Sequence, residues 1–232
     1  MPGVFTADPR IVRDAVLLPR VSFEEMLELA VLGAKVLHYR AAELARRYRV
    51  PLQLMSSFED TPGTVVRSGH DMEFEQINSV TSKTGVVLVR TRTRGDDSAP
   101  PGLMREIAAR DVQIIDYTRV SGSDGTALTF VVDREDLEAL REALATLDSA
   151  HTQSEITDGV ASVSVVGSGL ACSPHTLAEV ERVLTDAGIP ILHVGTSSLS
   201  ITCIIPVAAR ETAVEILHMR FIDKARTPHE PR

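Results

Sequence analysis

Two polar loops in the sequence carry the residue types best suited to binding a small charged molecule. Each loop is expected to run from a strand into the N-terminus of a helix, where unpaired backbone N–H groups and the positive end of the helix dipole attract an anion. The carboxylate of an amino acid can bind at such a place, while its ammonium group needs acceptors from a neighbouring strand or an acidic side chain. The pattern therefore indicates a possible amino-acid site in each loop.

The first loop covers residues 95–101 and offers Asp97 and Gly102, with Gln113 on the strand that follows. Gly102 would let a ligand approach the backbone closely, because glycine has no Cβ. The second loop covers residues 167–174, and its facing strand offers Thr196 and Ser197. The simpler alternative is that Asp97 belongs to a solvated turn and that Thr196 and Ser197 only close a hairpin. On the residues alone, both interpretations stay open.

Other catalytic chemistries have little support in the sequence. The chain contains neither an H-E-x-x-H nor a C-x-x-C motif, and no pair of histidines has metal-ligand spacing on an expected helix, so no metal site is predicted. A G-x-S-x-G nucleophile elbow is also absent. Cys172 and Cys203 are the only cysteines, which is too few for a disulfide framework. Cys172 lacks a basic neighbour that would activate its thiol.

The elements that position these loops occur twice in the same order, which predicts two similar modules. Each module reads as a strand, a loop, a helix, two strands joined by a turn, and a second helix, over residues 80–148 and again over 158–223. The two copies are offset by about 77 residues, as expected for an internal duplication. Their first strands are expected to begin at Val86 and Val160. Sheets of this kind leave edges open, which favours pairing with a second copy of the chain.

The first 68 residues differ from this repeat and are expected to form a separate, mainly helical segment. Ser22 and Glu25 have the spacing of a capping box, so a helix should begin near Phe23. A second helix should end before Pro51, because the residue that precedes a proline avoids helical geometry. Residues 224–232 are expected to form a tail. The predicted fold class is α+β, with two βαββαβ modules after a helical segment.

The composition excludes several classes of protein. The 232 residues are 44% hydrophobic, and 32 acidic residues outnumber 24 Lys and Arg to give a net charge of −8. A nucleic-acid-binding protein would have the opposite balance, so no nucleic-acid partner is expected. No apolar run approaches the ~18 residues that a membrane span needs. No secretory signal is visible at the N-terminus, so we expect a cytoplasmic protein that does not act at a membrane.

Several strings, taken together, resemble the aspartate kinase family. The segment 3–10 reads GVFTADPR, where the family has G-V-Y-T-A-D-P-R. Residues 22–29 (SFEEMLEL), 33–38 (GAKVLH) and 56–64 (SSFEDTPGT) also match family strings in the same order. Val166-Gly167-Ser168-Gly169 resembles the opening of the family's second regulatory ACT domain. The resemblance covers nearly the whole chain and implies the end of an amino-acid-kinase domain followed by two ferredoxin-like ACT modules.

The resemblance also implies roles for particular residues. Phe5 takes the place of a nucleotide-contacting Tyr, and Arg10 and Lys35 match the family's ATP-contacting Arg and Lys. In the ACT modules, the family pattern implies an effector site at Asp97, Gly102, Gln113, Ile191, Thr196 and Ser197. Pro190 precedes Ile191 where the family has Asn, and four residues separate Asp97 from Gly102 where the family's D-x-P-G has two.

The family phosphorylates the side-chain carboxylate of aspartate with Mg-ATP. This sequence begins inside the kinase domain, so we expect no catalytic residues of its own, no catalysis by the chain alone, and no cofactor unless a catalytic partner brings Mg-ATP. The first hypothesis is a regulatory-subunit-like homologue that forms a homodimer through its ACT modules and binds an amino-acid effector or a catalytic aspartate kinase chain. The second is part of an active kinase completed by a partner chain. The third is a stand-alone ACT sensor or interaction module.

Overall fold

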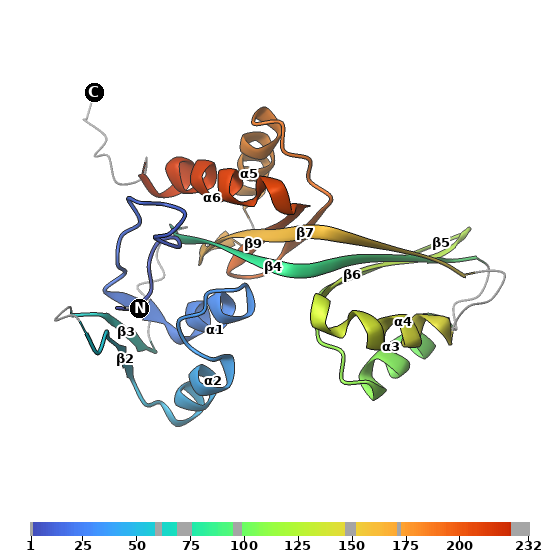
Figure 1. Cartoon of the computed structure of the whole chain (residues 1–232), viewed down its shortest axis with the longest axis horizontal. Coiled ribbons are helices and arrows are strands. Elements are labelled where there is room, and N and C mark those ends of the chain that lie inside the picture. Colours follow the sequence, from blue (N-terminus) through green and yellow to red (C-terminus); the bar gives the residue numbers. More distant parts are fainter. Residues whose placement is uncertain are drawn as a thin grey trace. The chain divides into compact units, whose positions relative to one another are not determined.

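The computed structural model describes residues 2–58, 62–68, 76–94, 99–146, 152–170 and 173–223. These residues belong to two compact units (Figure 1), one made of Met1–Lys83 and Ser162–Arg232 and the other of Thr84–Ala161. We call them the outer unit and the inserted unit, because the second interrupts the sequence of the first. Both mix helices and strands, which confirms the α+β class. Asp97, Cys172 and the expected tail lie outside the described residues.

The N-terminal segment of the outer unit forms a small three-stranded sheet with two helices. The elements are β1 (Arg20–Ser22), α1 (Phe23–Val31), α2 (Tyr39–Tyr48), β2 (Leu52–Leu54) and β3 (Thr64–Arg67). The strand order is β1-β3-β2, with β1 parallel and β2 antiparallel to β3. The predicted capping box is confirmed: the Ser22 hydroxyl accepts from the Glu25 N–H at 3.0 Å, and the Glu25 carboxylate accepts from the Ser22 N–H at 3.1 Å.

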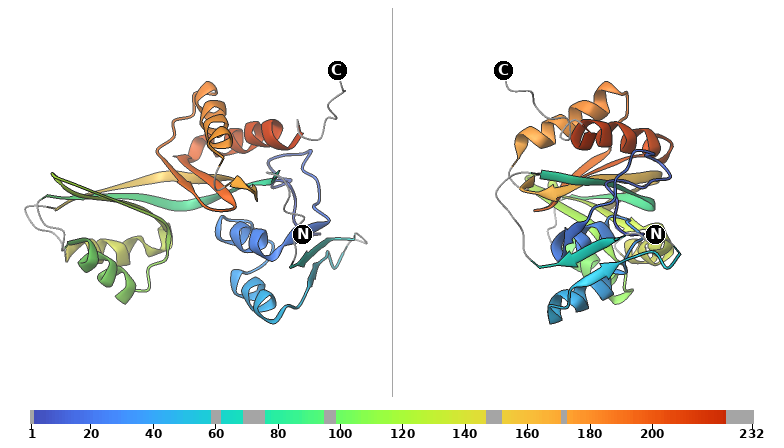
Figure 2. Two further views of the ribbon diagram at one scale, coloured as in Figure 1. Left: turned by 180° about the vertical axis from the view of Figure 1, so that it is seen from behind. Right: turned by 90° about the vertical axis from the view of Figure 1, so that its left-hand side faces the viewer.

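The rest of the outer unit is the second predicted module. It contains α5 (Pro174–Asp186), β8 (His193–Thr196), β9 (Ser200–Pro206), a 3-10 turn (Val207–Ala209), α6 (Arg210–His218) and a π-helical turn (Met219–Asp223). Helices α5 and α6 cover one face of its sheet, and α1 of the N-terminal segment lies against the other face (Figures 1 and 2). Two apolar cores result, and Val166 of the sheet packs with Phe23 and Met26 in the second of them.

The inserted unit is the first predicted module. It contains α3 (Ala99–Ala109), β5 (Ile114–Gly122), β6 (Gly125–Asp133), a 3-10 turn (Arg134–Asp136) and α4 (Leu137–Ala145). Strand β6 pairs antiparallel with β5 on one side and with residues 86–93 on the other. Phe130 and Leu128 of β6 pack with Leu103 of α3 and Leu140 of α4, so both helices share one core with the sheet.

Two strands are much longer than the sequence predicts, and each runs from one unit into the other. Strand β4 covers Gln76–Thr93 and β7 covers Thr152–Ser168, in a sheet of order β5-β6-β4-β7-β9-β8. The sequence predicts that these strands begin directly after Gly85 and Gly159, because each glycine interrupts the apolar pattern. In the structure these glycines continue the strands with φ values of +70° and +71°, a conformation that other residues rarely adopt.

Candidate functional site

The N-terminal loop that resembles a nucleotide-binding segment is held firmly to the second module. Its backbone folds back on itself, because Thr6 N–H donates to Val16 O at 2.9 Å and Leu18 N–H donates to Val4 O at 2.8 Å. Val80 N–H of β4 donates to Thr6 O at 2.7 Å. The Thr6 side chain is buried and lies 2.9 Å from Nε2 of His218 at the end of α6. The loop therefore has a fixed position on the module.

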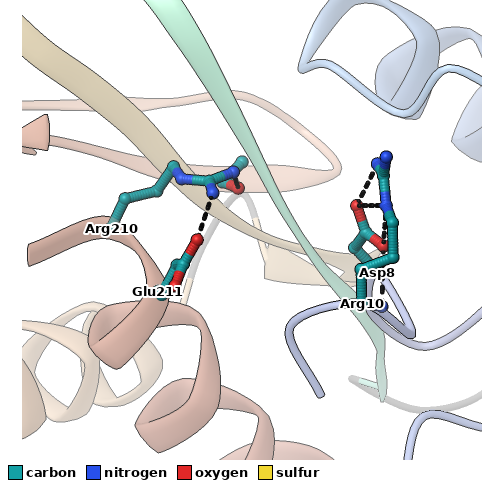
Figure 3. Close-up of polar contacts among 5 residues, drawn as sticks. Asp8, Arg10, Arg210 and Glu211 are labelled. Carbon is teal, nitrogen blue, oxygen red and sulfur yellow. Dashed lines mark hydrogen bonds and ion pairs between the residues drawn. The ribbon is translucent and has the colours of Figure 1, made fainter. Parts of the chain in front are cut away.

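Arg10 projects from this loop and is paired with an acidic residue two positions before it. Its Nη2 lies 2.6 Å from Asp8 Oδ2, and its Nε lies 3.0 Å from Asp8 Oδ1 (Figure 3). The guanidinium of Arg10 lowers the pKa of Asp8, and its backbone N–H and the charge of Arg210 act in the same direction. The pKa of Arg10 is raised in turn by Asp8. Arg10 remains exposed, so a phosphate group could reach it from solvent. The phosphate would compete with the Asp8 carboxylate for the guanidinium.

Phe5 and Lys35 lie on either side of helix α1 in sequence. Phe5 is half-buried and forms an isolated antiparallel bridge with Leu17. Lys35 is exposed in the connection between α1 and α2. This connection is held against β4 at Gly33, whose φ is +109°: a Cβ there would lie 2.8 Å from the Cβ of Lys83. Phe5, Arg10 and Lys35 all belong to the outer unit, and none of the hydrogen bonds or ion pairs of the described residues joins them to one another.

The predicted effector residues fall into both units. In the inserted unit, Gly102 lies within α3, which begins at Ala99. The helix can include the two prolines at 100–101, because proline is tolerated in the first turn. Gln113 is exposed just before β5, and its backbone N–H donates to Asp136 Oδ2 at 3.0 Å. Asp97 lies outside the described residues.

In the outer unit, the effector residues surround the hairpin of β8 and β9. Ile191 is partly buried against the core shared by α5 and α6. Thr196 is exposed at the end of β8. Ser197 closes the hairpin: its N–H donates to Ser200 O at 2.9 Å, and its hydroxyl accepts from the backbone N–H of Leu199 and Ser200 at 3.1 and 3.0 Å. Ser197 therefore closes the hairpin, which was one of the two interpretations of the sequence.

The sequence reasoning missed Glu28, which is the partner of this hairpin. Glu28 Oε1 accepts from the hydroxyls of Ser197 and Ser200 at 2.5 and 2.6 Å. It also missed Asp8 and the buried pair of Thr6 and His218. Only Asp8 had a local signal, its position two residues before Arg10. The other contacts join residues more than 150 positions apart.

A small pocket lies beside α1 where the N-terminal segment meets β4. Its lining includes Arg20, Glu25, Asn78 and Ser79. Asn78 donates to Glu25 Oε1 at 2.6 Å, and the buried hydroxyl of Ser79 has no hydrogen-bond partner. The pocket has room for about one water molecule, so it is too small for an amino acid or a nucleotide.

Within residues 2–58, 62–68, 76–94, 99–146, 152–170 and 173–223, no group of His, Cys, Asp and Glu side chains is arranged to hold a metal ion. None of the helices in these ranges combines the length and apolar character that a membrane crossing requires.

Comparison with known proteins matches two stretches of the chain to protein families. Residues 1–56 match the amino acid kinase family and residues 155–219 match the ACT domain family. Aspartokinases from Geobacillus stearothermophilus and Mycolicibacterium smegmatis are 36% and 37% identical, over 94% of this chain and 54% of their own length. The chain therefore spans about half the length of these curated relatives.

Solved structures support the same assignment. Aspartate kinase from Synechocystis has a TM-score of 0.60 at 27% identity, covering 100% of this chain and 42% of that one. Aspartokinase III of E. coli has a TM-score of 0.80 at 24% identity, covering 94% and 50%, and shows the same fold. These similarities relate the chain to the aspartokinases, with one stretch that matches the amino acid kinase family and a later stretch that matches the ACT domain.

Proposed function

We propose that this chain acts as the regulatory part of an aspartate kinase, with ACT modules that pair with a second copy and bind an amino-acid effector. The similarity to aspartokinases and the ACT match support this role. The regulatory subunit of aspartate kinase from Thermus thermophilus has a related fold, with a TM-score of 0.58 at 22% identity over 62% of this chain and 98% of that one. Aspartokinase III of E. coli has been crystallised with lysine and aspartate, which points to amino acids as the effector class.

Kinase activity in this proposal needs the remainder of an amino acid kinase domain, encoded in the same polypeptide or in a second chain. The observation that carries this part is an exposed apolar surface on the N-terminal segment. Leu44 and Tyr48 of α2, Met55 after β2, and Phe58 are 57%, 67%, 49% and 97% exposed. Leu44 and Tyr48 are four positions apart and therefore lie on one face of α2. In this proposal the missing part of the domain covers these exposed apolar side chains.

Phe5 and Arg10 of the N-terminal loop and Lys35 after α1 supply an aromatic ring and two cations, which in this proposal form one edge of a nucleotide site. When Mg-ATP is held by the completed domain, it supplies the phosphoryl group that is transferred to aspartate. Lys35 and Arg10 would contact phosphate oxygens, and Phe5 would lie against the nucleotide, as their places in the family strings imply. Cationic stabilisation of those oxygens is the contribution expected of such residues in phosphoryl transfer. Asp8 would have to release Arg10 for this contact.

A complementation assay tests this proposal. The chain is co-expressed with the N-terminal part of the Geobacillus stearothermophilus aspartokinase that the chain does not match, and Mg-ATP-dependent phosphorylation of aspartate is measured. We expect a stable complex with activity that neither part has alone. Leu44→Asp with Phe58→Asp should abolish the complex, whereas Val207→Asp, at an exposed apolar residue of the second module, should not. Phosphorylation of aspartate by the isolated chain would refute the need for a completing segment.

A stand-alone amino-acid sensor is the second candidate, and the two ACT modules favour it equally. A thermal-shift screen of the proteinogenic amino acids separates the possibilities, because a ligand that binds only the folded state raises its stability by mass action. A shift with one amino acid and no complementation would favour the sensor. Complementation together with an amino-acid-dependent loss of kinase activity would favour the regulatory part.

A further inference from the structure

Helix α1 of the N-terminal segment and the β8–β9 hairpin of the second module meet at one carboxylate, that of Glu28. Glu28 Oε1 accepts hydrogen bonds from Ser197 Oγ at 2.5 Å and from Ser200 Oγ at 2.6 Å. Hydrogen bonds to an ionised acceptor are shorter and roughly twice as strong as those between neutral groups. Both serines are at least half-buried, so water competes little for the carboxylate. We call this pair of bonds the Glu28 contact.

The hairpin depends on the same hydroxyl that binds Glu28. Ser197 Oγ accepts from two backbone N–H groups of the turn, and it lies 3.0 Å from Ser200 Oγ. Because its lone pairs are used within the turn, its proton is directed to Glu28. Leu199 O in turn accepts from Gly167 N–H at 2.9 Å, which ties the turn to β7. A change in the geometry of this hairpin must therefore move or break the Glu28 contact.

Helix α1 joins the Glu28 contact to the loop that holds Lys35. The helix ends at Val31, and Gly33 then packs against β4 at Ser82 and Lys83 with no room for a Cβ. At the start of the same helix, Glu25 is bonded to Asn78 of β4. The helix thus contacts β4 near both of its ends and the hairpin in between.

We propose that Glu28 is a coupling residue, through which the state of the β8–β9 hairpin sets the position of the connection around Lys35. The functional role of this coupling rests on the proposed function, in which an effector that binds at the hairpin would act on the N-terminal segment along this route. Thr196 and Ile191, which the family pattern places at an effector site, lie in or next to the same hairpin.

Hydrogen exchange of the whole chain, read by mass spectrometry, tests the coupling without requiring kinase activity. Glu28→Gln keeps the shape of the side chain but removes its charge. We expect about tenfold faster exchange both in the hairpin, residues 195–201, and in the connection, residues 33–38. The matched controls are Glu24→Gln, at an exposed position of α1, and Ser198→Ala, at an exposed position of the hairpin, and both should leave exchange unchanged.

The second arm approaches the contact from the other side. Ser200→Ala removes one of the two bonds and should accelerate exchange in residues 33–38 as Glu28→Gln does. The double variant should cost less than the sum of the single ones, because both changes weaken the same contact. Faster exchange confined to residues 195–201 in both variants would overturn the coupling and leave the proposed function untouched. In the completed enzyme, Glu28→Gln should still bind the effector but lose at least half of the inhibition; full inhibition would also overturn the coupling.

Discussion

Thr6 Oγ1 and His218 Nε2 lie 2.9 Å apart, although 212 positions separate the two residues in the sequence. The same Thr6 oxygen accepts from Val16 N–H at 2.9 Å, and its backbone carbonyl accepts from Val80 N–H at 2.7 Å. One threonine therefore joins the N-terminal loop to β4 and to the last helix of the second ACT module. Ala7 and Val12 of the N-terminal segment also belong to the module's apolar core.

Loss of the Thr6 hydroxyl should destabilise the outer unit. Thr6→Val keeps the volume but leaves His218 and Val16 N–H without their buried partner, so we expect about 1–3 kcal/mol less stability in urea unfolding. His218→Phe should cost a similar amount, and the double variant should cost clearly less than the sum, because the single changes remove one shared bond. Fully additive losses would contradict a direct interaction between the two side chains.

The sequence predicted the local elements well and the long-range contacts poorly. The capping box of Ser22 and Glu25 located the start of α1 because the interaction is complete within four residues. Arg10 was found through a short string, and its partner Asp8 lies in that string. The partner of Ser197, in contrast, is 169 positions away, and no local pattern encodes such a contact.

The lengths of β4 and β7 show a second limit. Gly85 and Gly159 interrupt the apolar pattern, and glycine usually ends or weakens a strand. Here each glycine continues its strand at positive φ, within two residues of the boundary between the units. Whether a glycine ends a strand or continues it is decided by pairing with neighbouring strands, which the sequence of the segment itself does not contain.

Gly125→Ala should destabilise the inserted unit and leave the outer unit intact. Gly125 follows the turn between β5 and β6 with φ at +125°, and a Cβ would lie 1.9 Å from the carbonyl oxygen of Thr93. We expect a loss above about 1 kcal/mol, because both the conformation and the space exclude a side chain. Gly122→Ala in the same hairpin is the matched control, since a Cβ there meets open space.

Hydrogen exchange measures this outcome for each unit separately. In Gly125→Ala, amides of residues 114–133 should exchange faster, whereas amides of residues 200–206 should keep their protection. Equal acceleration in both segments would mean that the two units unfold as one cooperative block.

Acid should weaken the contact between α5 and the π-helical turn Met219–Asp223. Glu179 is bonded to Arg182 and Arg220, and these guanidinium groups lower its pKa from 4.5 to about 2. A carboxyl group whose pKa is lower in the folded state contributes stability above pH 4.5, and this contribution is lost as the pH falls towards 2. Glu179→Gln should therefore unfold at a lower temperature at pH 6.

The pH profile separates this effect from general acid sensitivity. Between pH 5 and pH 2.5, the difference in melting temperature between the parent chain and Glu179→Gln should shrink towards zero. Glu24→Gln, at an exposed position of α1, should follow the parent chain throughout. A difference that stays constant across this range would show that the two arginines do not stabilise the charged form of Glu179.

The thiol of Cys203 should resist modification until the chain unfolds. The side chain is fully buried in β9, and burial, reinforced by the charge of Glu181, raises its pKa to about 12. Only the thiolate reacts readily, so both access and ionisation protect it. In the Cys172→Ser variant, which leaves Cys203 as the only thiol, a disulfide reagent at pH 8 should react at least about 100-fold more slowly with the native chain than with the denatured one. Rapid stoichiometric labelling of the native variant would mean that β9 opens to solvent far more often than its position within the sheet allows.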